Sequence, residues 1–272
     1  EGTEVIGRGC FRNCTALESI DIPNTVTTIE GDAFHNCTSL RSVTIPNSVK
    51  TVGASFYGCS NLSDIKVPDH LYETSIFSGT GITDITVPEG TTAVGGFTDC
   101  TKLTSITFPE GVKALSDFSG CSSLRAIDIP DGVSVIGLGL FEHCTKLTKV
   151  TIPSSVVSLG SFAFHECSSL THIVIPNHVA TIGGFAFADC PLTSVTLGSG
   201  VTSIEELAFH NAPIRQLRCY AVVPPKLPGV VNGSFSADLV KGATLYVPAG
   251  TGMAYSESDW KIYFENIVEM EE

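Results

Sequence analysis

A cysteine close to a histidine is the pattern in this 272-residue chain that could carry chemistry. Cys37 follows His35 by two residues, and Cys167 follows His165 by the same spacing. A thiolate beside an imidazole is the arrangement of a cysteine nucleophile, and both side chains are also zinc ligands. Whether either chemistry applies depends on how often the surrounding pattern recurs.

The same spacing recurs along most of the chain. A phenylalanine returns ten times at steps of 20 to 23 residues, at positions 11, 34, 56, 77, 97, 118, 141, 164, 187 and 209. Three positions after it comes cysteine, except at Thr80 and Ala212, and then a short alternating run such as LTHIVIP at 170–176. One short strand per period of this length is the signature of a leucine-rich-repeat solenoid, whose units must stack to bury their apolar sides.

This register assigns the cysteines to the core. Eight of the ten occupy one column of the repeat, Cys10 falls in the column of Ala33, and Cys219 falls in a strand column. Free cysteine is among the most buried residue types, so we expect all ten to be buried structural thiols. Disulfides are an alternative at the spacing of about 5 Å between stacked coils, but neighbouring side chains would point the same way. No C-x-x-C pair supports a zinc site.

The histidines fall at variable positions. His35, His165 and His210 each follow the column phenylalanine, and His143 lies one place further from it. Because other coils carry unrelated residues there, we interpret these histidines as solvated surface residues. His172 and His178 lie in one unit without a third convergent ligand that the sequence identifies. The sequence therefore predicts no metal site and no cofactor.

Motif and charge patterns argue against several function classes. The chain has no phosphate-binding glycine loop, H-E-x-x-H, EF-hand loop or G-x-S-x-G, so we predict a non-enzymatic protein with no catalytic residue. A net charge of −13 with 15 lysines and arginines argues against nucleic-acid binding. No run of 18 apolar residues exists, so a membrane-spanning protein is not expected.

One unit illustrates the expected coil. In residues 147–153, LTKVTIP alternates apolar and polar residues as a half-buried strand does, and Pro153 ends it. A second extended segment ends at Gly160, and a helical turn places Phe164 and Cys167 on one face. We predict a right-handed leucine-rich-repeat superhelix, β-rich, with one parallel sheet on the concave side and short strands and helical turns on the back.

The domain organisation follows from the repeats. Residues 1–219 read as about ten repeats, the first one truncated, so we expect further sequence upstream of residue 1. Residues 220–272 hold Trp260 and four of the six tyrosines, and we predict that they form an aromatic C-terminal cap over the core. The coils within residues 69–121 are shorter on the side opposite the predicted strand, which predicts a local change in curvature.

The outward residues of the strands form the candidate protein-binding face. They are short and polar with no aromatic anchor, and this composition favours weak or avidity-dependent binding. Threonine also suits solvent-facing strands without any function. The candidate residues are Asp64, Lys66, Asp84, Thr86, Thr107, Asp128, Lys149, Thr151, His172 and Thr196.

Residues 156–176, VVSLGSFAFHECSSLTHIVIP, resemble the BspA-like leucine-rich repeat, and residues 243–270 resemble the terminal cap of those proteins. The resemblance implies a secreted or cell-surface protein of a gut or oral bacterium that binds proteins, with adhesion to host matrix or plasma proteins. We also expect the chain to be a monomer. The departures from the pattern are the shortened central coils, Thr80 and Gly198. A structural spacer of a longer surface protein is the alternative function, and a glycan-binding or enzymatic module has the least support.

Overall fold

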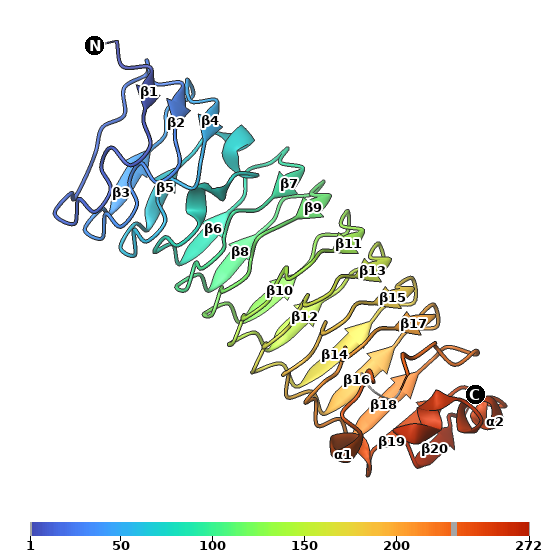
Figure 1. The fold of residues 1–272 in the computed structure, drawn as a ribbon. Coiled ribbons are helices and arrows are strands. Elements are labelled where there is room, and N and C mark those ends of the chain that lie inside the picture. The colour runs from blue at the N-terminus through green and yellow to red at the C-terminus, as the bar shows by residue number, and fades with distance from the viewer. Residues whose placement is uncertain (1, 230–232, 272) are drawn as a thin grey trace. The chain divides into compact units, whose positions relative to one another are not determined.

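The computed structural model describes residues 2–229 and 233–271 and confirms the repeat solenoid (Figure 1). The chain divides into two compact units, residues 1–124 and 125–272. Within each unit, successive coils contribute a longer strand to one row of parallel strands and a two-residue strand to a second row.

The first unit carries two pairs of longer strands. β3 (Ser42–Thr44) pairs with β5 (Asp64–Lys66), and β6 (Asp84–Thr86) pairs with β8 (Ser105–Thr107). The second row contains β1 (Val5–Ile6), β2 (Thr28–Ile29) and β4 (Thr51–Val52), followed by β7 (Ala93–Val94) and β9 (Ala114–Leu115).

Two 3-10 helices, Asp69–Leu71 and Ser75–Phe77, lie between β5 and β6, where the other coils of this unit have a two-residue strand. The local departure therefore begins where the sequence predicts shortened coils. The predicted change in curvature over residues 69–121 stays a prediction.

The second unit begins with the paired strands β10 (Ala126–Asp128) and β12 (Lys149–Thr151). A five-stranded parallel sheet follows, made of β14 (His172–Ile175), β16 (Ser194–Leu197), β18 (Gln216–Cys219), β19 (Thr244–Val247) and β20 (Asn266–Glu269). The two-residue strands are β11 (Val135–Ile136), β13 (Ser158–Leu159), β15 (Thr181–Ile182) and β17 (Ser203–Ile204).

The segment predicted as a cap adds α1 (Ala237–Val240), α2 (Gly252–Ser256) and a 3-10 helix over Asp259–Ile262. It also supplies β19 and β20, which continue the sheet of the preceding repeats in parallel register. The boundary between repeats and cap at residues 219 and 220 stays a prediction.

Stacked phenylalanine rings run through the core of each unit. In the first unit Phe34 lies between Phe11 and Phe56, with ring centroids 5.1 and 4.9 Å apart and nearly parallel planes. In the second unit the separations from Phe141 to Phe209 are 5.4, 5.2 and 5.3 Å. The stacking is continuous from Phe141 to Phe209 in the second unit, whereas in the first unit it runs from Phe11 to Phe56 and again from Phe77 to Phe118.

The column continues one place beyond the repeats that the sequence defines. Phe235 stacks on Phe209 at 5.2 Å and also contacts the rings of Trp260, Tyr263 and Phe264. The aromatic residues near the C-terminus thus pack against the end of the column in the second unit.

A tight turn follows each phenylalanine of the column. The residue two places after it has a positive φ in all ten coils, and asparagine, aspartate or glycine fills eight of these positions. These three residue types adopt the left-handed region with the least strain. The exceptions are His143 and Glu166, in consecutive coils of the second unit.

Candidate functional site

The predicted binding residues of the first unit lie on its longer strands. Asp64 and Lys66 are on β5, Asp84 and Thr86 on β6, and Thr107 on β8, and all five are exposed. Thr86 lies directly beside Thr107 in the parallel register. The strands thus present these side chains to solvent, and their role in binding stays a prediction.

The predicted residues of the second unit lie in the corresponding row. Asp128 on β10 accepts a hydrogen bond from the Thr151 hydroxyl on β12, where Lys149 is also exposed. His172 on β14 is exposed, and Thr196 on β16 is half-buried. Their role also stays a prediction, but the structure adds residues to this row.

The outward row continues through β18, β19 and β20. The register aligns Val174, Thr196, Arg218, Tyr246 and Val268 across the five strands. The Arg218 guanidinium lies 5.0 Å from the centre of the Tyr246 ring, a cation–π distance. The expectation of a strand face without an aromatic anchor is wrong for this sheet, because the sheet extends into a segment that the repeat pattern does not cover.

A shallow groove of about 430 Å³ lies at the end of the same strands. Val174 and Tyr220 line it with 60% and 45% of their surfaces exposed, and His178 lies beside them. The other lining residues are Ser154, Ile175, Pro176, Asn177, Thr196 and Gly198. Exposed apolar side chains therefore occur at the edge of an otherwise polar row.

The cysteine column proves to be a column of thiol hydrogen bonds. All ten cysteines are free, and eight are buried. The Sγ of a column cysteine donates to the carbonyl of the phenylalanine in the preceding coil, as Cys59 does to Phe34 at 3.0 Å and Cys190 to Phe164 at 3.0 Å. At Thr80 the hydroxyl instead donates to the carbonyl of Phe77 within its own coil.

Cys10 and Cys14 are exposed, so the expectation that all ten thiols are buried is wrong for these two. Both lie in the first coil, whereas Cys37 donates to the Phe11 carbonyl of the coil that covers it. The buried column thiols bond to the coil on their N-terminal side, as Cys37 does.

Thiol labelling at pH 8 is expected to separate the two groups. Burial raises the pKa of Cys59 and of Cys100 to about 12, so almost no thiolate is present there at pH 8. We expect two fast-reacting thiols with an aromatic disulfide reagent in the native protein, and ten in denaturant. A Cys10→Ser, Cys14→Ser double variant should show no fast phase, and a fast phase that persists there would contradict the assignment.

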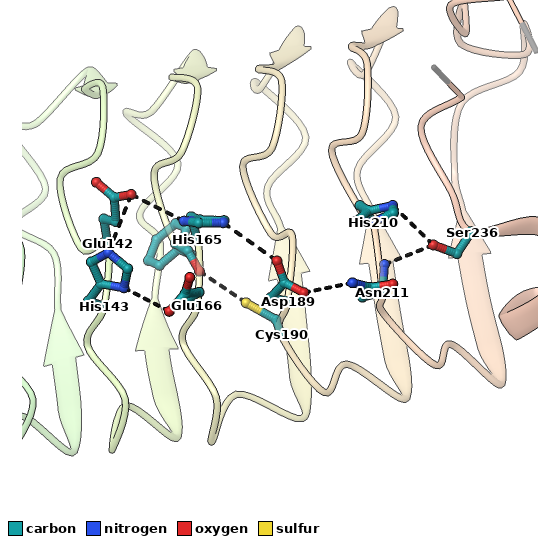
Figure 2. Close-up of polar contacts among 10 residues, drawn as sticks. Glu142, His143, His165, Glu166, Asp189, Cys190, His210, Asn211 and Ser236 are labelled. Carbon is teal, nitrogen blue, oxygen red and sulfur yellow. Dashed lines mark hydrogen bonds and ion pairs between the residues drawn. The ribbon is translucent and has the colours of Figure 1, made fainter. Parts of the chain in front are cut away.

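Histidines and carboxylates from consecutive coils form a cluster in the second unit (Figure 2). Glu142 Oε1 lies 3.1 Å from His165 Nδ1, and His143 Nδ1 lies 3.0 Å from Glu166 Oε2. His165 has only 17% of its side chain exposed, so it is not the freely solvated residue that the sequence suggested.

The sequence signal for this cluster was the order of the residues. Phe141 is followed by Glu and His, and Phe164 is followed by His and Glu. Because equivalent positions of consecutive coils stack, the inverted order pairs each histidine with a carboxylate. Comparing each position across all coils hid this pairing between two particular neighbours.

Comparison with known proteins supports the repeat assignment. A family model described as the BspA type leucine rich repeat region matches residues 1–96 and 94–215, with six copies. No curated protein matches the chain significantly. In the part of the chain that the structure describes, no helix has the length and apolar character to cross a bilayer.

Two solved structures share the architecture. A leucine-rich repeat protein from Bacteroides ovatus is 27% identical over 93% of this chain and 68% of that chain, with a TM-score of 0.70. A leucine-rich repeat protein from Eubacterium ventriosum is 22% identical over 88% of this chain and 80% of that chain, with a TM-score of 0.55, which shows the fold alone. With its repeats matched over most of its length, the chain belongs to the BspA type leucine-rich repeat family.

Proposed function

We propose that this chain is a non-enzymatic module, secreted or displayed on the cell surface, that binds a host matrix or plasma protein. Membership of a leucine-rich-repeat family supports a protein-interaction repeat module, and proteins of this fold are generally not enzymes. The resemblance to BspA-like proteins supports the surface location and the adhesive role, and the proposal takes the chain to be a monomer.

The observation that carries the proposal is the outward row of the sheet β14–β20. It places the Val174 and Tyr220 groove beside the Arg218–Tyr246 pair. Tyrosine and arginine are enriched among residues that dominate binding energy, and an apolar groove takes a side chain of the partner. The groove and the Arg218–Tyr246 pair offer apolar and aromatic contacts that the short polar side chains of the predicted binding face lack.

A binding assay on purified matrix and plasma proteins at physiological salt tests this surface. We expect saturable binding of the full chain to at least one immobilised protein. Tyr220→Ala and Val174→Lys are each expected to weaken it by about tenfold or more, about 1.4 kcal/mol, because each removes an exposed groove contact.

The matched control is Val135→Lys. Val135 lies on β11 in the other row of strands and is 48% exposed, so a lysine there alters a comparable valine away from the groove. Its affinity should equal that of the wild type. Equal binding by Val174→Lys and the wild type would rule out this surface, and failure to bind any protein of the panel would favour a structural spacer.

A further inference from the structure

The histidine–carboxylate cluster of the second unit brings three metal-ligating side chains together. Glu142, His143 and His165 offer ligand atoms that all lie within 4.8 Å of one another. Glu142 Oε1 is central, 3.7 Å from His143 Nε2 and 3.1 Å from His165 Nδ1. Tetrahedral zinc with bonds near 2.0–2.1 Å places its ligand atoms about 3.4 Å apart. Small rotations of these side chains therefore suffice to surround an ion.

The second ring nitrogen of each histidine faces a carboxylate (Figure 2). His143 Nδ1 lies 3.0 Å from Glu166 Oε2, and His165 Nε2 lies 3.5 Å from Asp189 Oδ2. Metal-bound histidines almost always have such an outer partner, which fixes the ring and its tautomer. Each histidine thus has one nitrogen toward Glu142 and the other toward an outer acid.

The outer acid Asp189 is itself held in place. Its Oδ1 accepts a 2.8 Å hydrogen bond from the Asn211 side chain, and the backbone N–H of Asn211 donates to Ser236 Oγ. The network therefore extends over several consecutive coils beyond the ligating residues, as Figure 2 shows.

The backbone at the cluster is strained where other coils are relaxed. His143 and Glu166 have φ of 58° and 57°, at the turn position that elsewhere carries asparagine, aspartate or glycine. Histidine tolerates this region better than most residues, whereas glutamate does not share that preference. Strain of this kind persists where a side chain is needed at that place, so it points to a role for Glu166.

Two further strained residues flank the site. Phe162 and Phe185 have φ of 59° and 58° and stack on each other at 4.9 Å. The His165 ring stands nearly perpendicular to both, 5.4 Å from Phe162 and 6.5 Å from Phe185. The rings of Phe162 and Phe185 restrict the orientation of the His165 imidazole and make its surroundings apolar. The side chain of His143 remains 46% exposed.

We propose that Glu142, His143 and His165 bind a zinc-class divalent cation that bridges two consecutive coils. Two imidazoles and one carboxylate suit Zn²⁺, whereas Ca²⁺ and Mg²⁺ prefer all-oxygen sites. Glu166 and Asp189 act as positioning residues for the two rings. Three protein ligands leave a coordination position for water or for a ligand group of a partner. The proposal is independent of the strand surface discussed above.

Zinc titration of the full chain tests the site. The background is the Cys10→Ser, Cys14→Ser variant, stripped with a chelator, so that exposed thiols do not bind the metal. We expect one Zn²⁺ per chain with a Kd in the micromolar range or below, measured by competition with a chromophoric chelator. Co²⁺ should give a visible spectrum of nitrogen and oxygen ligation without a thiolate charge-transfer band.

The variants separate ligands from bystanders. His143→Ala and His165→Ala should abolish binding, and Glu166→Gln should weaken it about 10–100-fold with the fold unchanged by circular dichroism. The matched control is His210→Ala, at the same turn position as His165 but beside Ser236 rather than a second histidine. Its Kd should be unchanged.

Two results would overturn the proposal: no Zn²⁺ bound up to about 100 µM in the Cys10→Ser, Cys14→Ser background, or equal affinity in that background with and without the His143→Ala and His165→Ala substitutions. If His165→Ala fails to fold, Glu166→Gln provides the test, because Glu166 is exposed and its substitution leaves the core untouched. An unchanged Kd for Zn²⁺ in Glu166→Gln would also reject the arrangement.

Discussion

Phe164→Ala is expected to lower the free energy of unfolding of the second unit by about 3–5 kcal/mol. Phe164 is fully buried and stacks between Phe141 and Phe187 at 5.4 and 5.2 Å. Removing the ring leaves a cavity in the middle of a column whose neighbours are fixed by their own coils. The gap cannot close by relaxation of one residue, so the effect should fall in the upper part of the range for such substitutions.

The matched variant lies two residues away. Phe162 is half-buried with a φ of 59°, so Phe162→Gly loses the stack on Phe185 but relieves the backbone strain. These effects offset, and we expect a change within about 1 kcal/mol.

Urea unfolding followed by circular dichroism, with amide hydrogen exchange on β13 and β15, measures both variants. Exchange is needed because repeat arrays can unfold in parts. Similar losses in Phe164→Ala and Phe162→Gly would show that the column does not dominate stability.

The coil itself was predictable because every coil repeats the same local solution. The phenylalanine, the cysteine three places later and the alternating strand residues recur at fixed positions, so each one confirms the others. Phe235 was missed because it lies 26 residues after Phe209, outside the spacing of 20 to 23 residues, and because Asp238 stands where the other coils carry cysteine, threonine or alanine. Its place in the column depends on packing against Phe209 and the aromatic residues around Trp260, and these contacts join distant segments.

The surface features were less predictable for a related physical reason. Averaging a position over ten coils removes the individual pairs, and the contact of Glu142 with His165 exists only between two particular neighbours. The same holds for Arg218 and Tyr246, since the register of β18 with β19 depends on the course of the chain between them. Repetition therefore predicts the core well and the surface poorly.

Trp260→Ala is expected to lower the free energy of unfolding of the second unit by about 3–5 kcal/mol. The ring is fully buried, and its centroid lies 5.7 Å from Phe235 and 5.5 Å from Tyr255. Its Nε1 donates a 2.8 Å hydrogen bond to the buried carbonyl of Pro225. Truncation removes the packing over the end of the phenylalanine column and also leaves that carbonyl without this donor.

Trp260→Phe separates the two contributions, because it keeps most of the apolar ring and removes only the N–H. Loss of the hydrogen bond to Pro225 should cost about 1–3 kcal/mol, less than the full truncation. Met253→Ala is the control, since Met253 on α2 is 73% exposed and its substitution should change stability by less than about 0.5 kcal/mol.

Thermal unfolding and limited proteolysis after residue 220 measure all three variants. If Trp260→Ala leaves this segment as protected as Met253→Ala does, the aromatic cluster does not stabilise the end of the column. A loss confined to Trp260→Ala and Trp260→Phe instead shows that the tryptophan ties the segment around Pro225 to the core.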